Sequence, residues 1–210
     1  MGPRNDLTRF AWNYGIEQMR KASNLAHRTI GTVLVVASVL ALNEAFLNGS
    51  RSLRIAWSGL VTVIGVLFVL SLLFRHELRL LPGWLADLAE DPQERQHLIM
   101  GLLLTAGGLV EFTHAKGWTT ALIWHYAWPG VLLVIGVMFA LHAQHGSHDA
   151  AMRAVRFHRL LGGTLIAAGL LAAGHALWRS LSWAYLWPIA LLVAAVLLIS
   201  YREPEGGWEG

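Results

Sequence analysis

The sequence contains no cysteine and little charge, and both absences narrow the class of protein. Without cysteine, disulfide bonds, thiolate metal sites and iron–sulfur clusters are excluded. Charged residues make up 14% of the 210 residues, against about 25% in a typical soluble domain. A hydrophobic content of 55%, with ten tryptophans and 21 glycines, is instead typical of a polytopic membrane protein. The composition therefore argues against an ordinary soluble enzyme and against a disordered protein.

Motifs of the common enzyme classes are also missing. There is no glycine–lysine phosphate-binding loop, no nucleophile elbow and no dinucleotide fingerprint. No basic stripe interleaved with aromatic residues indicates nucleic acid as a partner, so we attribute the net charge of +3 to basic loops beside the membrane. We therefore expect a binding or structural protein rather than an enzyme, with the lipid bilayer as a partner.

Six stretches of the chain are long and apolar enough to cross a bilayer, which takes about 20 mainly apolar residues. They cover residues 27–47, 55–74, 97–113, 121–141, 160–177 and 181–200. The sequence thus predicts an all-α bundle of six transmembrane helices within residues 24–203, followed by a polar C-terminal tail at 204–210. Residues 1–23 mix aromatic and charged residues and predict an amphipathic interfacial segment rather than a signal peptide. A second interfacial segment is expected at 80–88.

Basic residues divide unequally between the two sides of this bundle. One side, called here the termini side, holds the N-terminus, the loops 75–96 and 142–158 and the C-terminal tail. It carries twelve of the sixteen lysine and arginine residues. The opposite side, called the hairpin side, carries Arg51, Arg54, Lys116 and Arg179. The positive-inside rule therefore predicts that both termini are cytoplasmic, in a bacterial inner membrane.

An internal repeat organises the six spans. The odd-numbered spans open with His-x-x-x-Gly, at His27, His97 and His158. The even-numbered spans carry Trp57, Trp128 and Trp187, which follow the opening histidines by 30, 31 and 29 residues. This spacing predicts three tandem helical hairpins, at about 24–78, 94–145 and 155–203, related by an axis along the membrane normal. Glycines within the spans, Gly130, Gly136, Gly162 and Gly163 among them, are expected to permit close helix packing.

Histidine or glutamate stands at both ends of each odd-numbered span. Seventeen residues after the opening histidines come Glu44, His114 and His175, about 25 Å farther along a helix and close to the thickness of the hydrocarbon core. The termini side could then gather His27, His97 and His158. The hairpin side could gather Glu44, His114 and His175, with Glu111 or His125 in support. Seventeen residues fall about 100° short of five full turns, so both ends can face inward only if the helices cross at an angle.

Either set is a plausible ligand shell for Zn, Cu or Fe. The first hypothesis is therefore a membrane protein that binds a transition metal through histidine-rich sites near the two membrane faces, in metal handling or transport. His142, His145 and His148 form a further run on the termini side, which could bind a metal loosely as a loop.

The same histidines allow two other hypotheses. The His-x-x-x-Gly openings resemble those of cytochrome b561-type proteins. That resemblance implies haem b held by His97 with His158 and by His114 with His175, in an electron-transfer subunit. The overall layout resembles uncharacterised histidine-rich, six-helix bacterial inner-membrane proteins, which implies no particular activity. In the third hypothesis the histidines are interfacial residues of a structural or assembly subunit, which works with other membrane subunits in a larger complex.

Overall fold

The computed structural model describes residues 4–75, 91–142, 147–178 and 180–205, and every regular element in these ranges is a helix. Side chains of residues 4–16, 74 and 75 lie outside the description. The helices are α1 (Arg4–Phe46), α2 (Arg51–Arg75), α4 (Pro92–Lys116), the short 3₁₀ helix η1 (Leu122–Tyr126), α5 (Ala127–Ala140), α6 (His148–Trp178) and α7 (Leu181–Ser200). The all-α fold class expected from the sequence is confirmed for the described ranges.

Within the described ranges, six helical stretches are long and apolar enough to cross a membrane, with mean hydropathies between 1.5 and 2.3. They are Glu17–Phe46, Arg51–Leu73, Pro92–Lys116, Leu122–Ala140, His148–Trp178 and Leu181–Ser200. Large apolar side chains such as Val39, Val63 and Leu102 face outward and are exposed. An apolar outer surface of this kind suggests contact with lipid. The expectation of six helices long and apolar enough to span a membrane is therefore confirmed for the described part of the chain.

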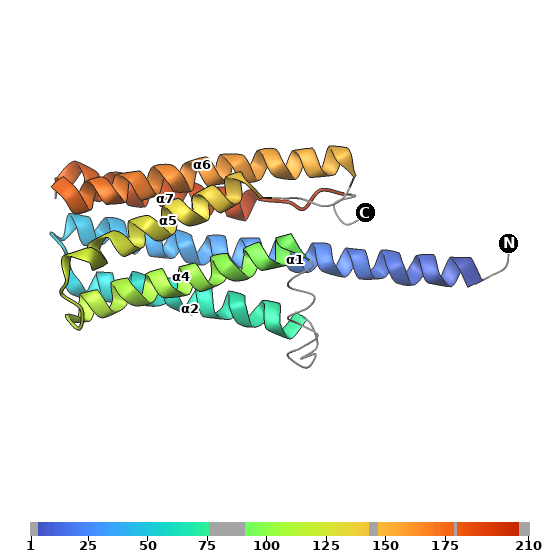
Figure 1. Ribbon diagram of the computed structural model, residues 1–210, viewed down its shortest axis with the longest axis horizontal. Coiled ribbons are helices and arrows are strands. Elements are labelled where there is room, and N and C mark those ends of the chain that lie inside the picture. Colours follow the sequence, from blue (N-terminus) through green and yellow to red (C-terminus); the bar gives the residue numbers. More distant parts are fainter. Residues whose placement is uncertain (1–3, 76–90, 143–146, 179, 206–210) are drawn as a thin grey trace.

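Helix α1 differs from its sequence-based boundaries. It is a single 43-residue helix, so the expected interfacial segment and the first span form one element with no break between them. Figure 1 shows the N-terminal part of α1 extending beyond the other helices. The second expected interfacial segment, 80–88, lies outside the described residues.

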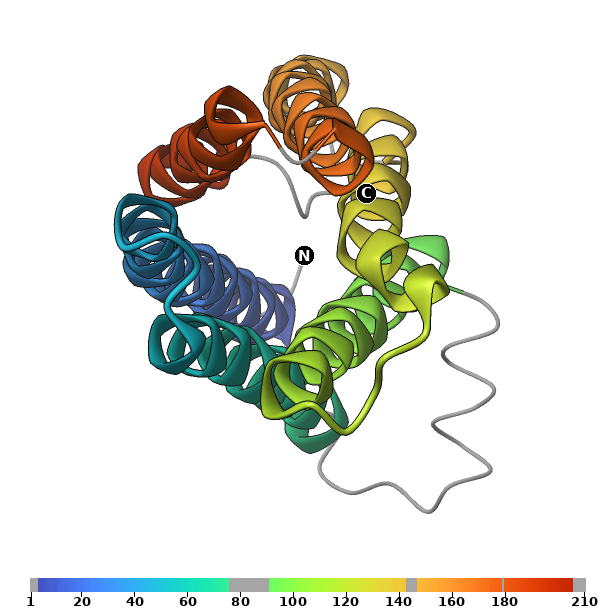
Figure 2. The same cartoon turned by 90° about the vertical axis from the view of Figure 1, so that its left-hand side faces the viewer.

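The helices form a closed ring in chain order. Each helix packs against the next one along the chain, and α7 returns to pack against α1. Figure 2, which views the bundle from its end, shows this ring. The turns on the hairpin side are short, and one of them is tied to its neighbour by Arg51. Its guanidinium group donates hydrogen bonds to the carbonyls of Ala115 and Lys116 at the end of α4. Gly117 ends α4 in the left-handed conformation, with φ 79°.

Glycine allows a close helix contact between α5 and α6. A Cβ atom added to Gly162 would lie 2.5 Å from the carbonyl oxygen of Gly136, and one added to Gly136 would lie 2.9 Å from that of Gly162. Gly31 makes a similar approach to Ala195 as α1 meets α7. The expected role in close packing is thus confirmed for Gly136 and Gly162. It fails at Gly130 and Gly163, where an added Cβ would have no neighbour within 4 Å.

Candidate functional site

Three tryptophans from the even-numbered spans meet in the middle of the bundle. The ring centroid of Trp57 lies 5.6 Å from that of Trp128 and 5.7 Å from that of Trp187, and all three residues are buried. Cavities lie on both sides of this cluster, and Trp128 lines both of them. The tryptophans that mark the sequence repeat therefore stand between the two ends of the bundle interior.

On the termini side, four histidines form a buried or half-buried cluster. The His142 ring lies 4.6 Å from that of His158 and 5.3 Å from that of His97, measured between centroids. His27 lies 6.3 Å from His158 in the same measure. His27, His97 and His158 were expected to converge here. The structure brings them into one cluster, but His97 reaches His158 through His142.

Hydrogen bonds fix the proton position on two of these rings. His27 Nδ1 lies 2.8 Å from the backbone oxygen of Ser23, and His142 Nδ1 lies 2.6 Å from Oε1 of Gln96. Both oxygens only accept hydrogen bonds, so each Nδ1 carries the proton and each Nε2 keeps its lone pair. A metal-binding histidine has this same arrangement, with one nitrogen held by an oxygen acceptor and the other available as a ligand.

His158 is the most deeply buried ring of the cluster, with 2% of its surface exposed. Its Nδ1 makes no hydrogen bond with a described residue. Its Nε2 has no hydrogen-bond partner among the described residues. A buried polar atom without a partner costs about 1–3 kcal/mol, so this nitrogen calls for a ligand or a functional explanation.

The segment after α7 covers the cluster. The Tyr201 ring lies 4.5 Å from His27 and 5.3 Å from His158, between centroids. Its hydroxyl donates to Glu203 Oε2 at 3.1 Å, and Ser23 donates to the same oxygen at 2.9 Å. Burial, together with the Glu203 carboxylate, raises the pKa of Tyr201 well above its usual range, so the phenol remains a donor.

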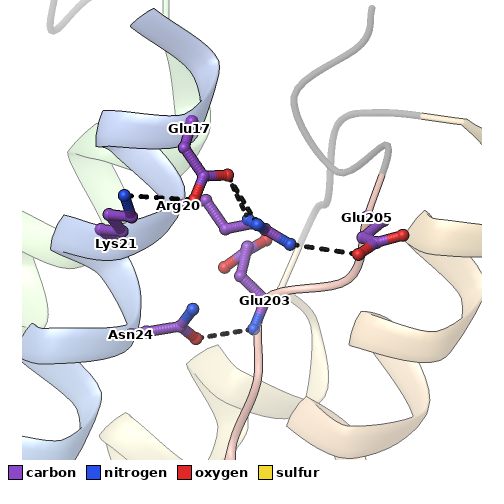
Figure 3. Close-up of polar contacts among 6 residues, drawn as sticks. All are labelled: Glu17, Arg20, Lys21, Asn24, Glu203 and Glu205. Carbon is purple, nitrogen blue, oxygen red and sulfur yellow. Dashed lines mark hydrogen bonds and ion pairs between the residues drawn. The ribbon is translucent and has the colours of Figure 1, made fainter. Parts of the chain in front are cut away.

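Helix α1 holds this C-terminal segment in place. The backbone N–H of Glu203 donates to Oδ1 of Asn24 at 2.8 Å, and Arg20 reaches Glu205 at 3.5 Å while also pairing with Glu17 (Figure 3). Residues 201–205 are anchored by α1, whereas Trp208 lies outside the described residues.

Sequence reasoning missed His142 and Tyr201 as members of the cluster. Each stands fourteen residues after the tryptophan of its even-numbered span, Trp128 or Trp187. Fourteen residues fall only about 40° short of four full helical turns, so such a residue shares the inward face of the tryptophan. That spacing was the available signal. His145, a member of the expected His142–His148 run, lies outside the described residues, and His148 is exposed at the start of α6.

The hairpin-side cavity has a volume of about 430 Å³. Its polar lining comes from Glu44, Arg54, Glu111, His125 and His175. Glu44 is firmly held, because Oε1 accepts from Arg54 Nε at 2.7 Å and Oε2 accepts from Trp57 Nε1 at 2.7 Å. Of the expected hairpin-side set, Glu44 and His175 both reach this cavity.

His114 does not belong to the lining that the described residues form. Its Nδ1 lies 3.0 Å from the backbone oxygen of Thr119, and its ring lies 4.4 Å from that of His125. The spacing from the opening histidine does not explain the difference, because Glu44 and His175 stand at the same seventeen-residue spacing and line the cavity. The hydrogen bond to Thr119 and the contact with His125 direct the His114 ring toward the turn that follows α4. Glu111 is the residue of α4 that lines the cavity.

No group of three histidine, aspartate or glutamate side chains within the described ranges is arranged to hold a metal ion. On the termini side the histidines are neighbours in pairs, with His142 as the link. On the hairpin side the expected set is divided between the cavity and the His114–His125 pair. Comparison of the sequence with protein-family models and with curated proteins gave no match. The site is therefore interpreted from its own geometry.

Proposed function

We propose that this membrane protein binds a transition-metal ion at the termini-side cluster of His27, His97, His142 and His158. The observation that carries the proposal is His158, a buried imidazole with an unpartnered Nε2 among three other histidines. The protonation of His27 and His142 at Nδ1 leaves two more Nε2 lone pairs. Neutral imidazoles suit Zn²⁺, Cu²⁺ and Fe²⁺. Small rotations of paired rings would be needed for three of them to share one ion.

At the termini-side cluster, a transition-metal ion is better supported than haem. His142 contacts both His97 and His158, the two rings between which a haem was expected. The termini-side cavity of about 120 Å³ is also below the roughly 300 Å³ at which pockets for organic ligands begin. At the other end, His114 bonds Thr119 rather than lining the cavity with His175.

The proposal includes a membrane topology. In this proposal the chain consists of three hairpin repeats, which bring His27, His97 and His158 to one end of the bundle. Recurring contacts support the repeat. Small residues stand eight residues after each tryptophan, and each packs against the next odd-numbered span around the ring: Gly65 against α4, Gly136 against α6 and Ala195 against α1. The excess of lysine and arginine on the termini side supports a cytoplasmic location for the cluster, in a bacterial inner membrane.

The rival is a structural role for the histidines in an assembly subunit. It is favoured by the lack of a ready three-ligand group in the described part of the chain. Metal content separates the two hypotheses. Detergent-purified protein is stripped of metal, dialysed against Zn²⁺ or Co²⁺, and its bound metal is measured by mass spectrometry. We expect about one ion per chain in the wild type and at least a tenfold loss of affinity in the double variant His142→Ala/His158→Ala.

The matched control is the double variant His114→Ala/His125→Ala, which removes a second pair of contacting histidine rings from the other end of the bundle. It should keep the metal. Equal metal content in all three proteins, with the helical circular dichroism unchanged, would leave only the structural role. A reducible Soret band in protein as first purified would support haem instead.

A further inference from the structure

The hairpin-side cavity takes no part in the proposed metal centre. At about 430 Å³ it falls within the usual size range of small-molecule sites. The cavity lies inside the ring of helices, near the hairpin-side ends of α1, α4 and α6. The three tryptophans line it as well. The polar and charged groups around this space indicate what kind of molecule it would accept.

The carboxylates of the cavity differ in their partners. Glu44 is compensated by Arg54 and by the indole N–H of Trp57. Glu111 is nine-tenths buried, with 9% of its surface exposed, and its side chain forms no hydrogen bond or ion pair with any described residue. The Arg54 guanidinium attracts the Glu111 carboxylate electrostatically, and the Glu44 carboxylate repels it. Arg54 is engaged by Glu44 and is the one lysine or arginine in the described lining, so an ionised Glu111 adds a negative charge that no second basic side chain there compensates.

Aromatic and small residues complete the walls around Glu111. Trp57, Trp128 and Trp187 all line the cavity, and indole faces attract cations, most strongly where water is excluded. Ala41 and Ala172 occupy in α1 and α6 the place that Glu111 occupies in α4, fourteen residues after the opening histidine. They also line the cavity. One carboxylate therefore stands opposite two small side chains, which leave room beside it.

We propose that this cavity binds a small organic ammonium ion, with Glu111 as its counter-charge and the tryptophans around its alkyl groups. An anion would meet the excess negative charge, and a neutral molecule would leave Glu111 without a partner. A buried carboxylate and indole faces together are the means by which proteins recognise quaternary ammonium groups.

The test compares choline with its uncharged isostere, 3,3-dimethylbutan-1-ol, on the full chain in a maltoside detergent. Binding is followed by calorimetry and by tryptophan fluorescence. We expect choline to bind at least tenfold more tightly than the isostere, because only choline carries the charge. The variant Glu111→Gln keeps the shape of the side chain and should weaken choline binding at least tenfold, with no change for the isostere.

Asp149→Asn is the charge-matched control, since it removes one exposed carboxylate from the opposite end of the bundle. It should bind choline as the wild type does. Equal binding of choline and the isostere, or no choline binding at millimolar concentration, would overturn the proposal. Full choline binding by Glu111→Gln would do so too. If the Gln variant fails to fold, the comparison of choline with its isostere on the wild type still tests whether the cavity selects a cation.

Discussion

Glu44 shows how a single buried residue connects stability with the shape of a site. Its two oxygens accept hydrogen bonds from Arg54 and Trp57, so the carboxylate positions a cation and one of the three central indoles. Glu111, at the same end of the interior, has no such partner among the described residues. Two glutamates with similar burial thus have different tasks. Glu44 fixes the wall of the cavity, and Glu111 remains available to a ligand.

The variant Glu44→Gln should lower the free energy of unfolding by about 1–3 kcal/mol, the usual cost of leaving a buried charged or polar partner poorly satisfied. Arg54 would keep its charge without a counter-charge. Unfolding in mixed dodecylsulfate and maltoside micelles, followed by tryptophan fluorescence, measures the change. Glu205→Gln is the control, because the Glu205 side chain is 91% exposed, and it should behave as the wild type. Equal stability of all three proteins would show that the Glu44 pair contributes nothing.

At the scale of elements, neighbouring helices approach most closely where glycine replaces a side chain. Gly162→Ala should lower the free energy of unfolding by about 1–3 kcal/mol, as overpacking generally does. The added Cβ would meet the Gly136 carbonyl at 2.5 Å, and a backbone atom cannot easily move away. Unfolding in mixed micelles and the amount of folded protein recovered are the readouts.

The neighbouring residue offers a matched control for this contact. At Gly163 an added Cβ has no neighbour within 4 Å, so Gly163→Ala should be neutral or stabilise the helix by up to about 1 kcal/mol. The two substitutions are chemically identical and one residue apart. If both changed stability by the same amount, the α5–α6 contact would not depend on glycine.

The elements also show how far the sequence could be interpreted. The six expected spans follow from apolar runs, because a long apolar helix satisfies its own backbone in lipid, and the described ranges contain six such helices. The continuity of α1 could not be foreseen, since polar residues before the first span are compatible with either a straight or a broken helix. His27, His97 and His158 were placed at one end correctly. His114 was expected to join Glu44 and His175, but the spacing that it shares with them does not reveal its hydrogen bond to Thr119.

Contacts that depend on helix rotation were the hardest to predict. His142 and Tyr201 lie just beyond the apolar runs, where a sequence pattern suggests loop residues, and the fourteen-residue spacing from Trp128 and Trp187 went unused. Glu203 follows α7 and carries no motif, yet it joins Ser23 to Tyr201. Metal binding and the haem and assembly alternatives stay predictions, as does the resemblance to cytochrome b561-type proteins.

At the scale of the whole molecule, the ring of six helices separates a histidine cluster at one end from an acidic and aromatic cavity at the other. The two proposed sites would then face different sides of the membrane, so the orientation of the bundle has to be tested. The chain contains no cysteine, so single cysteines can report the topology without background. Thr119→Cys should react with a membrane-impermeant maleimide in intact spheroplasts, and Asp149→Cys should react only after lysis. The opposite pattern would reverse the proposed orientation.

The claim that the histidine cluster binds a metal is tested most directly by X-ray absorption at the zinc edge. Metal-depleted protein is loaded with one equivalent of Zn²⁺ and freed of excess ion. We predict a first shell of nitrogen at about 2.0–2.1 Å, with the outer-shell scattering of two or more imidazole rings, and its loss in His142→Ala/His158→Ala. Zinc that does not remain bound, or a first shell of oxygen without imidazole scattering, would contradict the assignment of this cluster as a metal site.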